Sequence, residues 1–185
     1  MRKNFGVKSW FYPQPVLIIA TYDENGNPDA MNAAWGGLYD GNKVELCLSA
    51  GHKTTKNIRA VGAFTVSFAD AANLVASDYV GLASANTEPK KMEKSGFHLT
   101  KSQFVNAPLI DELPVAMECK LVKINEDGNV IGEIVNVSAD ESVLGEDGNI
   151  DFSKFRPISF EPVHNGYHVL GQRVGNAFQD GAALK

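Results

Sequence analysis

Residues 44–68 decide the fold, and they read VELCLSAGHKTTKNIRAVGAFTVSF. Residues 44–49 alternate between apolar and polar side chains, which is typical of a strand. Residues 63–68 also alternate and are rich in β-branched and aromatic side chains, which predicts a second strand. Between them the sequence predicts a short helix with Thr54 as its N-cap, Ile58 in the core and Gly62 at its end.

The link before this helix is unusually rich in groups that bind anions. It brings together Ser49, His52, Lys53, Thr54 and Thr55. The first turn of a helix has unpaired N–H groups and partial positive charge, so hydroxyls and a lysine there favour a phosphate. A capped turn with a solvated lysine fits the same spacing equally well, because Ser and Thr cap helices of every kind.

Composition sets the class of protein. The chain has 185 residues, of which 44% are hydrophobic and 21% charged, and we expect one globular domain spanning 1–185. The formal net charge of −5 argues against general nucleic-acid binding. No apolar run follows the two N-terminal bases, and none approaches the roughly 18 residues of a membrane span, so we expect neither a signal peptide nor a membrane segment.

Cys47 and Cys119 are the only cysteines, and both lie in alternating patterns. We expect two reduced, buried thiols in a cytoplasmic protein, with a disulfide or a catalytic thiol as the minor alternative. The sequence has no CxxC motif and no His-rich cluster, so no metal site is expected.

Two strands are expected before the central stretch. The run 16–22 is almost wholly apolar, which predicts a strand covered on both faces. Asn25-Gly26 predicts a tight turn into a return strand at 29–37. Small side chains in that return strand would let a ligand approach the backbone, and Trp35 would offer it a flat face.

The next part of the chain is less regular. Residues 69–80 predict a helix capped by Asp70, with Leu74 and Val75 on one face. A short helical piece is expected at 90–94, ending before Gly96 and carrying solvated charges. Residues 97–108 read as an extended linker.

The last third predicts paired strands. Runs 113–124 and 130–139 alternate around a turn at 127–129 and form the clearest hairpin. Runs 158–161 and 167–170 form another. About seven strands with short helices predict a β-barrel domain, a fold that removes exposed sheet edges.

Several motifs occur in an order that resembles the flavin reductase-like, FMN-binding split-barrel family, in particular its flavoredoxin branch. The resemblance covers about 13–178. The motifs are MNAAW at 31–35, SAGHKTTKNI at 49–58, FTVS at 64–67, DYVG at 78–81, KMEKSG at 91–96, APLI at 107–110, ECKL at 118–121 and IGEI at 131–134.

The resemblance implies a mainly β fold, a six-stranded Greek-key-type split barrel with short helical insertions, which forms a homodimer with FMN near the subunit interface. It implies that Asn32, Ala33 and Ala34 lie along the isoalloxazine and that Trp35 packs against the ring. The phosphate and ribityl chain would be held by Ser49, Ala50, His52, Lys53, Thr54 and Thr55.

The resemblance also implies that Lys91 reaches toward the flavin and that Asp78 and Tyr79 come across the dimer interface.

The chain differs from the family pattern at two positions. Many relatives carry Arg where this chain has His52, which places a titratable imidazole at the phosphate site. Segment 84–90 is one residue longer than usual, which leaves Lys90 as the alternative to Lys91.

The implied activity is that of an oxidoreductase that moves hydride or electrons from NADH, NADPH or a redox partner through FMN to an acceptor. The flavin performs the chemistry and the protein positions it, so no catalytic side chain is assigned. The alternative is a flavoredoxin-type electron carrier without a nicotinamide site. The sequence has no Gly-rich dinucleotide fingerprint.

A third alternative is a barrel that binds haem or another non-flavin cofactor. His164 and His168 are the candidates for such a site. They lie on either side of the Asn165-Gly166 turn, which predicts exposed hairpin histidines because a paired metal site at this spacing needs a helix.

Overall fold

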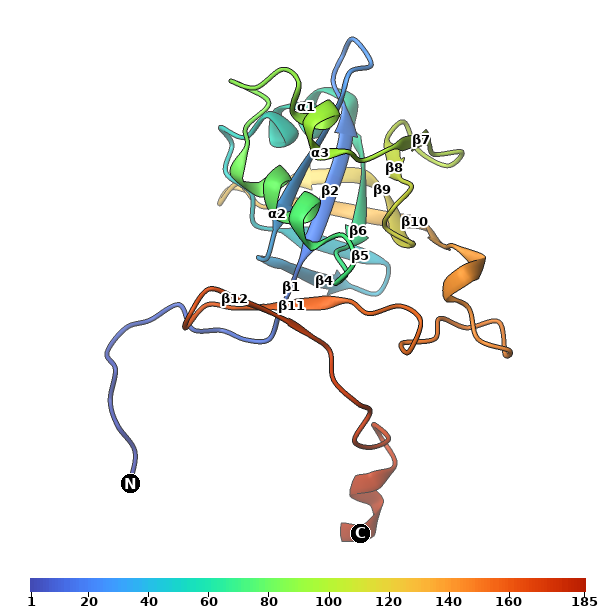
Figure 1. Cartoon of the computed structure of the whole chain (residues 1–185). Coiled ribbons are helices and arrows are strands. Elements are labelled where there is room, and N and C mark those ends of the chain that lie inside the picture. Colours follow the sequence, from blue (N-terminus) through green and yellow to red (C-terminus); the bar gives the residue numbers. More distant parts are fainter.

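The computed structural model describes all 185 residues. Figure 1 shows a curled antiparallel sheet with short helices packed around it, while both chain ends lead away from the body beside β1 and β11. The main sheet has the order β3-β2-β6-β9-β10-β5-β4. Its strands are β2 (Leu17–Tyr22), β3 (Pro28–Ala33), β4 (Gly36–Asp40), β5 (Lys43–Leu46), β6 (Ala63–Phe68), β9 (Val115–Ile124) and β10 (Val130–Ala139).

Smaller elements surround this sheet. A second sheet joins β1 (Gln14–Pro15), β11 (Ile158–Glu161) and β12 (Gly166–Val169), and a separate hairpin joins β7 (Leu99–Lys101) to β8 (Pro108–Ile110). The helices are α1 (Lys53–Val61), α2 (Leu74–Leu82) and α3 (Lys91–Ser95), with the 3₁₀ turns η1 (Glu141–Val143) and η2 (Asp180–Leu184). None of these helices is long and apolar enough to cross a membrane.

Strand β2 is covered on both faces, as its apolar sequence predicts. Ile18 and Ala20 belong to a core cluster that includes Val80 of α2, whereas Leu17 and Ile19 belong to a second cluster inside the curled sheet. The alternation of period two assigns successive side chains to these opposite faces. The fold is therefore mainly β with short helices, and the predicted split barrel is confirmed.

The return strand predicted at 29–37 is wrong in its extent. The chain instead forms β3, leaves it after Ala33, and resumes at Gly36 as β4 on the opposite edge of the sheet. A Cβ on Gly36 would lie 2.8 Å from the Leu46 side chain, so only glycine allows this close approach to β5. The sheet has seven strands rather than six, and β3 and β4 remain its two edges.

Two helix assignments also need correction. Thr54 is not the N-cap of α1, because the cap is His52 and Thr54 lies in the first turn. Helix α2 begins at Leu74 rather than near Asp70, and Val75 is 83% exposed instead of lying on the buried face. The predicted end of α1 at Gly62 is confirmed, with φ at 73° in the left-handed region.

The predicted late strands are confirmed, since β9 pairs with β10 and β11 pairs with β12. The linker prediction for 97–108 is wrong, because Leu99–Lys101 pairs with Pro108–Ile110 as a short hairpin. Alternation over three residues is too short to predict such strands from sequence.

Candidate functional site

The N-terminus of α1 is open. Residues 49–52 precede it and are exposed, and His52 caps the helix through its backbone alone, with φ −64° and ψ 141° and no side-chain hydrogen bond to the first turn. Because the first N–H groups of a helix have no acceptor within it, those of Lys53, Thr54 and Thr55 remain available. This end therefore offers backbone donors and partial positive charge to an anion.

Two buried threonines in the first turn differ in what their hydroxyls do. Both residues are 1% exposed. The Thr54 hydroxyl donates to Asp29 Oδ2 at 2.5 Å, whereas the Thr55 hydroxyl has no partner. Buried hydroxyls are usually hydrogen-bonded, so the Thr55 hydroxyl is an exception within the first turn of α1.

Asp29 joins the candidate site, although the sequence did not predict a role for it. It lies on β3, is 2% exposed, and accepts a hydrogen bond from Lys91 Nζ at 3.2 Å as well as the one from Thr54. It thereby ties α1 and α3 to the sheet edge. The only feature of the sequence that could have indicated this role is a single carboxylate at the start of a strand rich in small residues.

Lys91 and Lys90 have opposite environments. Lys91 is 3% exposed and its charge is buried with Asp29, so the prediction of a solvated face is wrong for this residue. Lys90 is exposed and pairs with Glu93 at 3.7 Å on the surface. Of the two, Lys91 is the lysine that lies inside the molecule.

The longer segment 84–90 lies against the loop that precedes α1. Asn86 donates through its side chain to the Gly51 carbonyl at 3.1 Å and accepts from Lys56 Nζ at 3.2 Å. On the other side, Lys53 Nζ lies 3.5 Å from Asp23 Oδ2. The Lys53 ammonium therefore lies beside the helix end, and the Asp23 carboxylate partly neutralises its charge.

The residues expected beside a ring system lie farther along β3. Asn32 donates through its side chain to the Ser77 carbonyl of α2 at 3.0 Å, and a Cβ on Gly81 would lie 2.9 Å from Asn32 Cβ. Ala33 and Ala34 are half-buried, and Trp35 is 58% exposed in the break between β3 and β4. The indole is therefore free to contact a flat ligand.

A hollow of about 390 Å³ lies beside Trp35, and Phe11, Gln14 and Cys47 contribute to its lining. The Gln14 side-chain oxygen is buried and has no hydrogen-bond partner. The Cys47 N–H donates to the Trp35 carbonyl at 2.8 Å, which fixes the wall of the hollow. Its lining thus combines an aromatic face with one polar atom that a ligand could satisfy.

Cys47 is exposed, so the prediction that both thiols are buried is wrong; Cys119 is buried, and neither forms a disulfide. Strand β5 ends at Leu46, which takes Cys47 out of the alternation. Desolvation and the Glu45 carboxylate raise the pKa of the Cys47 thiol, which disfavours the thiolate that a catalytic cysteine needs.

Asp78 and Tyr79 of α2 have partners within this chain. Asp78 Oδ1 accepts a hydrogen bond from the Tyr167 hydroxyl at 2.8 Å, and Tyr79 packs against the core cluster that contains Val80. Burial and the bond to Asp78 raise the pKa of Tyr167 to about 12. Tyr167 on β12 was not singled out from the sequence.

The structure therefore brings the predicted residues together in two groups, which strand β3 connects. One group surrounds the N-terminus of α1 and reaches Lys91 through Asp29. The other runs from Asn32 to Trp35 and meets α2. No group of three or more His, Cys, Asp or Glu side chains could hold a metal ion, and His164 and His168 are exposed.

The fold is thus a split antiparallel barrel in which the N-terminus of α1, with no side-chain cap, lies beside the edge strand β3. The family described as the flavin reductase like domain matches residues 9–159. The chain belongs to this flavin reductase-like family, as its motifs predict.

Solved structures agree with this assignment. Flavoredoxin of Desulfovibrio vulgaris (Miyazaki F) superposes with a TM-score of 0.93 at 34% identity, covering 98% of this chain and 100% of that one. Flavoredoxin from Methanosarcina acetivorans gives 0.89 at 26% identity, with 100% of both chains covered. Nitrilotriacetate monooxygenase component B from Bacillus cereus shares the fold, with a TM-score of 0.76 at 22% identity over 90% of this chain and 88% of that one.

Curated relatives are more distant. An uncharacterized protein of Aquifex aeolicus is 35% identical over 74 residues, which is 38% of each chain. An uncharacterized protein of Aeropyrum pernix is 24% identical over 79% of this chain and 57% of its own length. The matched stretches therefore span less than two thirds of these two relatives.

Proposed function

We propose that this chain binds FMN with its phosphate at the N-terminus of α1 and acts as an oxidoreductase that passes electrons through the flavin. The observation that carries the proposal is the helix end itself. It is solvent-facing, no side chain caps it, and the buried Thr55 hydroxyl in its first turn has no partner. A phosphate would satisfy these donors together.

The residues fit FMN in two parts. Ser49, Ala50, His52, Lys53 and Thr55 would hold the phosphate and ribityl chain. Thr54 and Lys91 would support them from behind, because both bond to Asp29. This arrangement fixes the helix end before the ligand arrives, which is the preorganisation that tight binding needs.

The ring would lie along Asn32, Ala33 and Ala34, with Trp35 against it and the adjoining hollow at its edge. When bound, FMN supplies the electron-accepting chemistry. The residues of this chain orient it and exclude water. We assign no acid, base or nucleophile, in keeping with the raised pKa of Cys47.

The electron donor separates two forms of this proposal. In the first, NADH or NADPH donates hydride directly. In the second, the chain is an electron carrier reduced by a partner protein, and the 34% identity with a flavoredoxin over 98% of this chain favours this candidate.

The test is anaerobic mixing of the FMN-loaded protein with NADH or NADPH in a stopped-flow instrument. Rapid loss of the oxidised flavin absorbance, faster than for free FMN, supports the first form. Reduction by dithionite but by neither nucleotide supports the carrier. A protein that binds no FMN would overturn both.

We also propose that residues 1–185 form one domain that works in the cytoplasm as a homodimer, with FMN near the interface and with Asp78 and Tyr79 close to the partner. Support comes from the resemblance and from the large apolar side chains that the chain leaves uncovered, including Val174 and Phe178. Light scattering on the FMN-loaded protein would give the mass directly.

A further inference from the structure

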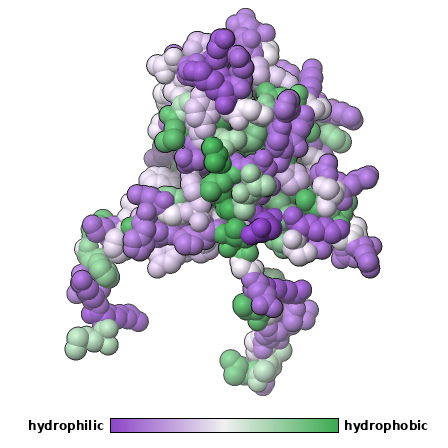
Figure 2. Space-filling model, in the orientation of Figure 1, coloured by the Kyte–Doolittle hydropathy of each residue, from purple (hydrophilic) through white to green (hydrophobic).

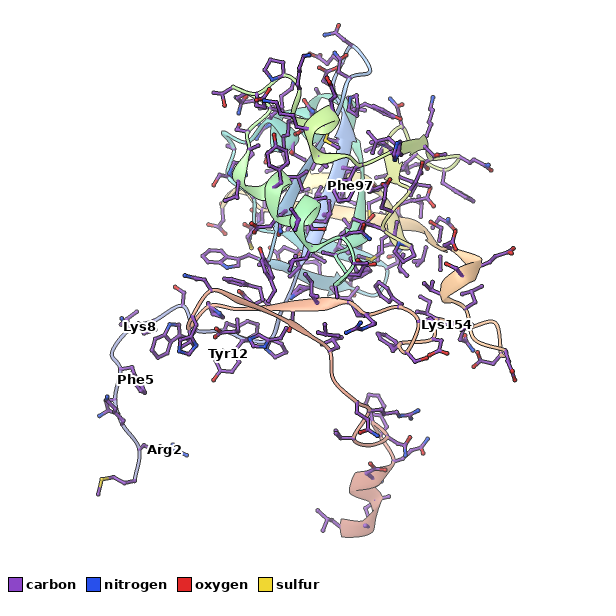
Figure 3. The ribbon with its side chains drawn as sticks, in the orientation of Figure 1. Arg2, Phe5, Lys8, Tyr12, Phe97 and Lys154 are labelled. Carbon is purple, nitrogen blue, oxygen red and sulfur yellow. The ribbon has the colours of Figure 1, made fainter.

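The first twelve residues form an arm that the body of the molecule does not cover. Figure 3 shows Arg2, Phe5 and Lys8 on an irregular segment that extends away from the sheet. Phe5 is 54% exposed, and its ring contacts Trp10 of the same arm with centroids 5.2 Å apart. Aromatic side chains held in this way, without a core beneath them, are typical of a segment that packs on another molecule.

An apolar groove of about 490 Å³ lies where this arm leaves the body. Its lining includes Phe68, Met117, Val137 and Phe152, together with Pro13 and Leu170, the residues at which the two chain ends leave the body. Both chain ends therefore depart from the mouth of the groove, and neither fills it. Figure 2 shows apolar side chains gathered where the C-terminal tail leaves the body.

Charge complements this shape. The arm carries Arg2, Lys3 and Lys8, whereas all 22 acidic residues of the chain follow position 22. A second hollow shares Phe152 and Leu170 with the groove, and its charged lining residues are three acids and one base: Glu146, Asp147, Asp151 and Arg173. A basic, aromatic segment and an acidic, apolar receptor are thus present on one chain, which is the condition for a self-complementary interface.

We propose that the arm of one copy, residues 1–12, crosses to a second copy and packs Phe5 and Trp10 in the groove of that copy, with its basic side chains against the acidic hollow. This inference rests on the self-association proposed above. A twelve-residue extended segment spans up to about 40 Å, which is long enough to cross a two-fold axis near the groove mouth. The prolines at 13 and 15 restrict the backbone where the arm would have to turn back onto its own groove.

The test joins arm and groove chemically in the full-length protein. Both forms carry Cys47→Ser, which removes the exposed thiol and leaves only the buried Cys119. One form carries Trp10→Cys and the other Phe152→Cys, and the two are co-expressed with different tags and treated with a short bis-maleimide. We expect a crosslinked heterodimer that carries both tags.

The matched control replaces Phe152→Cys by Val122→Cys, an exposed position on β9 outside the groove. Crosslinking at Phe152→Cys that does not exceed the control would overturn the proposal. The same holds if a single chain with Trp10→Cys and Phe152→Cys crosslinks within itself while the mixed pair does not, because the arm would then occupy its own groove.

A second measurement guards against poor crosslinking geometry. The variant R2E/K3E/K8E should dimerise at least tenfold more weakly in sedimentation while still binding FMN, which shows that it folds. Unchanged dimerisation would contradict the proposal. A wild-type monomer would overturn self-association as a whole, whereas a wild-type dimer without the crosslink would overturn only the role of the arm.

Discussion

The Asp29 carboxylate and the Lys91 ammonium lie 3.2 Å apart, and their side chains are only 2% and 4% exposed. The second carboxylate oxygen accepts the Thr54 hydroxyl, so one buried acid holds the start of α1 and the start of α3 against β3. Buried charges are tolerated only when they are paired and hydrogen-bonded, and here each has its partner. This pair positions the helix end that we propose binds the FMN phosphate.

Lys91→Met should destabilise the protein strongly. Removing one partner leaves the Asp29 carboxylate buried without its counter-charge, which typically costs about 3–5 kcal/mol in the free energy of unfolding. Urea denaturation measures this loss. Lys90→Met is the control, because Lys90 forms an exposed pair with Glu93 and should change stability by less than about 1 kcal/mol. Equal effects of the two substitutions would contradict the role of the buried pair.

Thr55→Val should separate ligand binding from folding. The Thr55 hydroxyl has no partner within the chain, so removing it should leave the stability of the FMN-free protein unchanged or raise it. A hydrogen bond to a charged phosphate is worth about 1.5–3 kcal/mol, so FMN should bind about tenfold more weakly or worse.

Titration with FMN and urea denaturation of the same samples check both parts. Ser67→Ala removes another buried hydroxyl without a partner, on β6, and should leave FMN affinity unaltered. If Thr55→Val binds FMN as tightly as the wild type, the hydroxyl takes no part in holding the phosphate.

Tyr167 should make stability depend on pH in the alkaline range. Its pKa is raised from 10.0 to about 12 in the folded protein, chiefly by burial and then by Asp78. The folded state thus holds the proton more tightly than the unfolded state, so this contribution is complete below about pH 10 and is lost as pH rises toward 12.

Tyr167→Phe removes this dependence along with the hydrogen bond to Asp78. At neutral pH the variant should be about 1 kcal/mol less stable than the wild type. The difference in free energy of unfolding should shrink between pH 10 and pH 12. A difference that stays constant over this range would show that the phenol is not held protonated by the fold.

Local patterns predicted much of the fold. The alternation of apolar and polar side chains predicted β5, β6, β9 and β10, although β6 is buried on both faces. Gly62 and Gly96 mark helix ends where the backbone is left-handed. The break between β3 and β4 within 29–37 could not be predicted. The chain crosses to the other edge of the sheet there because β4 pairs with β5, and a contact between strands leaves no local pattern in the sequence.

In the site too, features made by neighbouring residues could be predicted, whereas contacts between residues far apart in the sequence could not. The polar link before α1 was visible, because its residues are neighbours in sequence. The role of Asp29 was not, since its partners lie 25 and 62 residues away and no local pattern relates them. Tyr167 meets Asp78 across 89 residues for the same reason.

The most direct test of the central claim compares FMN with riboflavin, which has the same ring and ribityl chain but no phosphate. The cofactor-free protein is titrated with each in parallel, and quenching of flavin fluorescence gives stoichiometry and affinity. If the open end of α1 holds the phosphate, FMN should bind at about one per chain and about 100-fold more tightly than riboflavin, the value expected from one to two charge-assisted hydrogen bonds. Equal affinity for the two flavins would contradict the account.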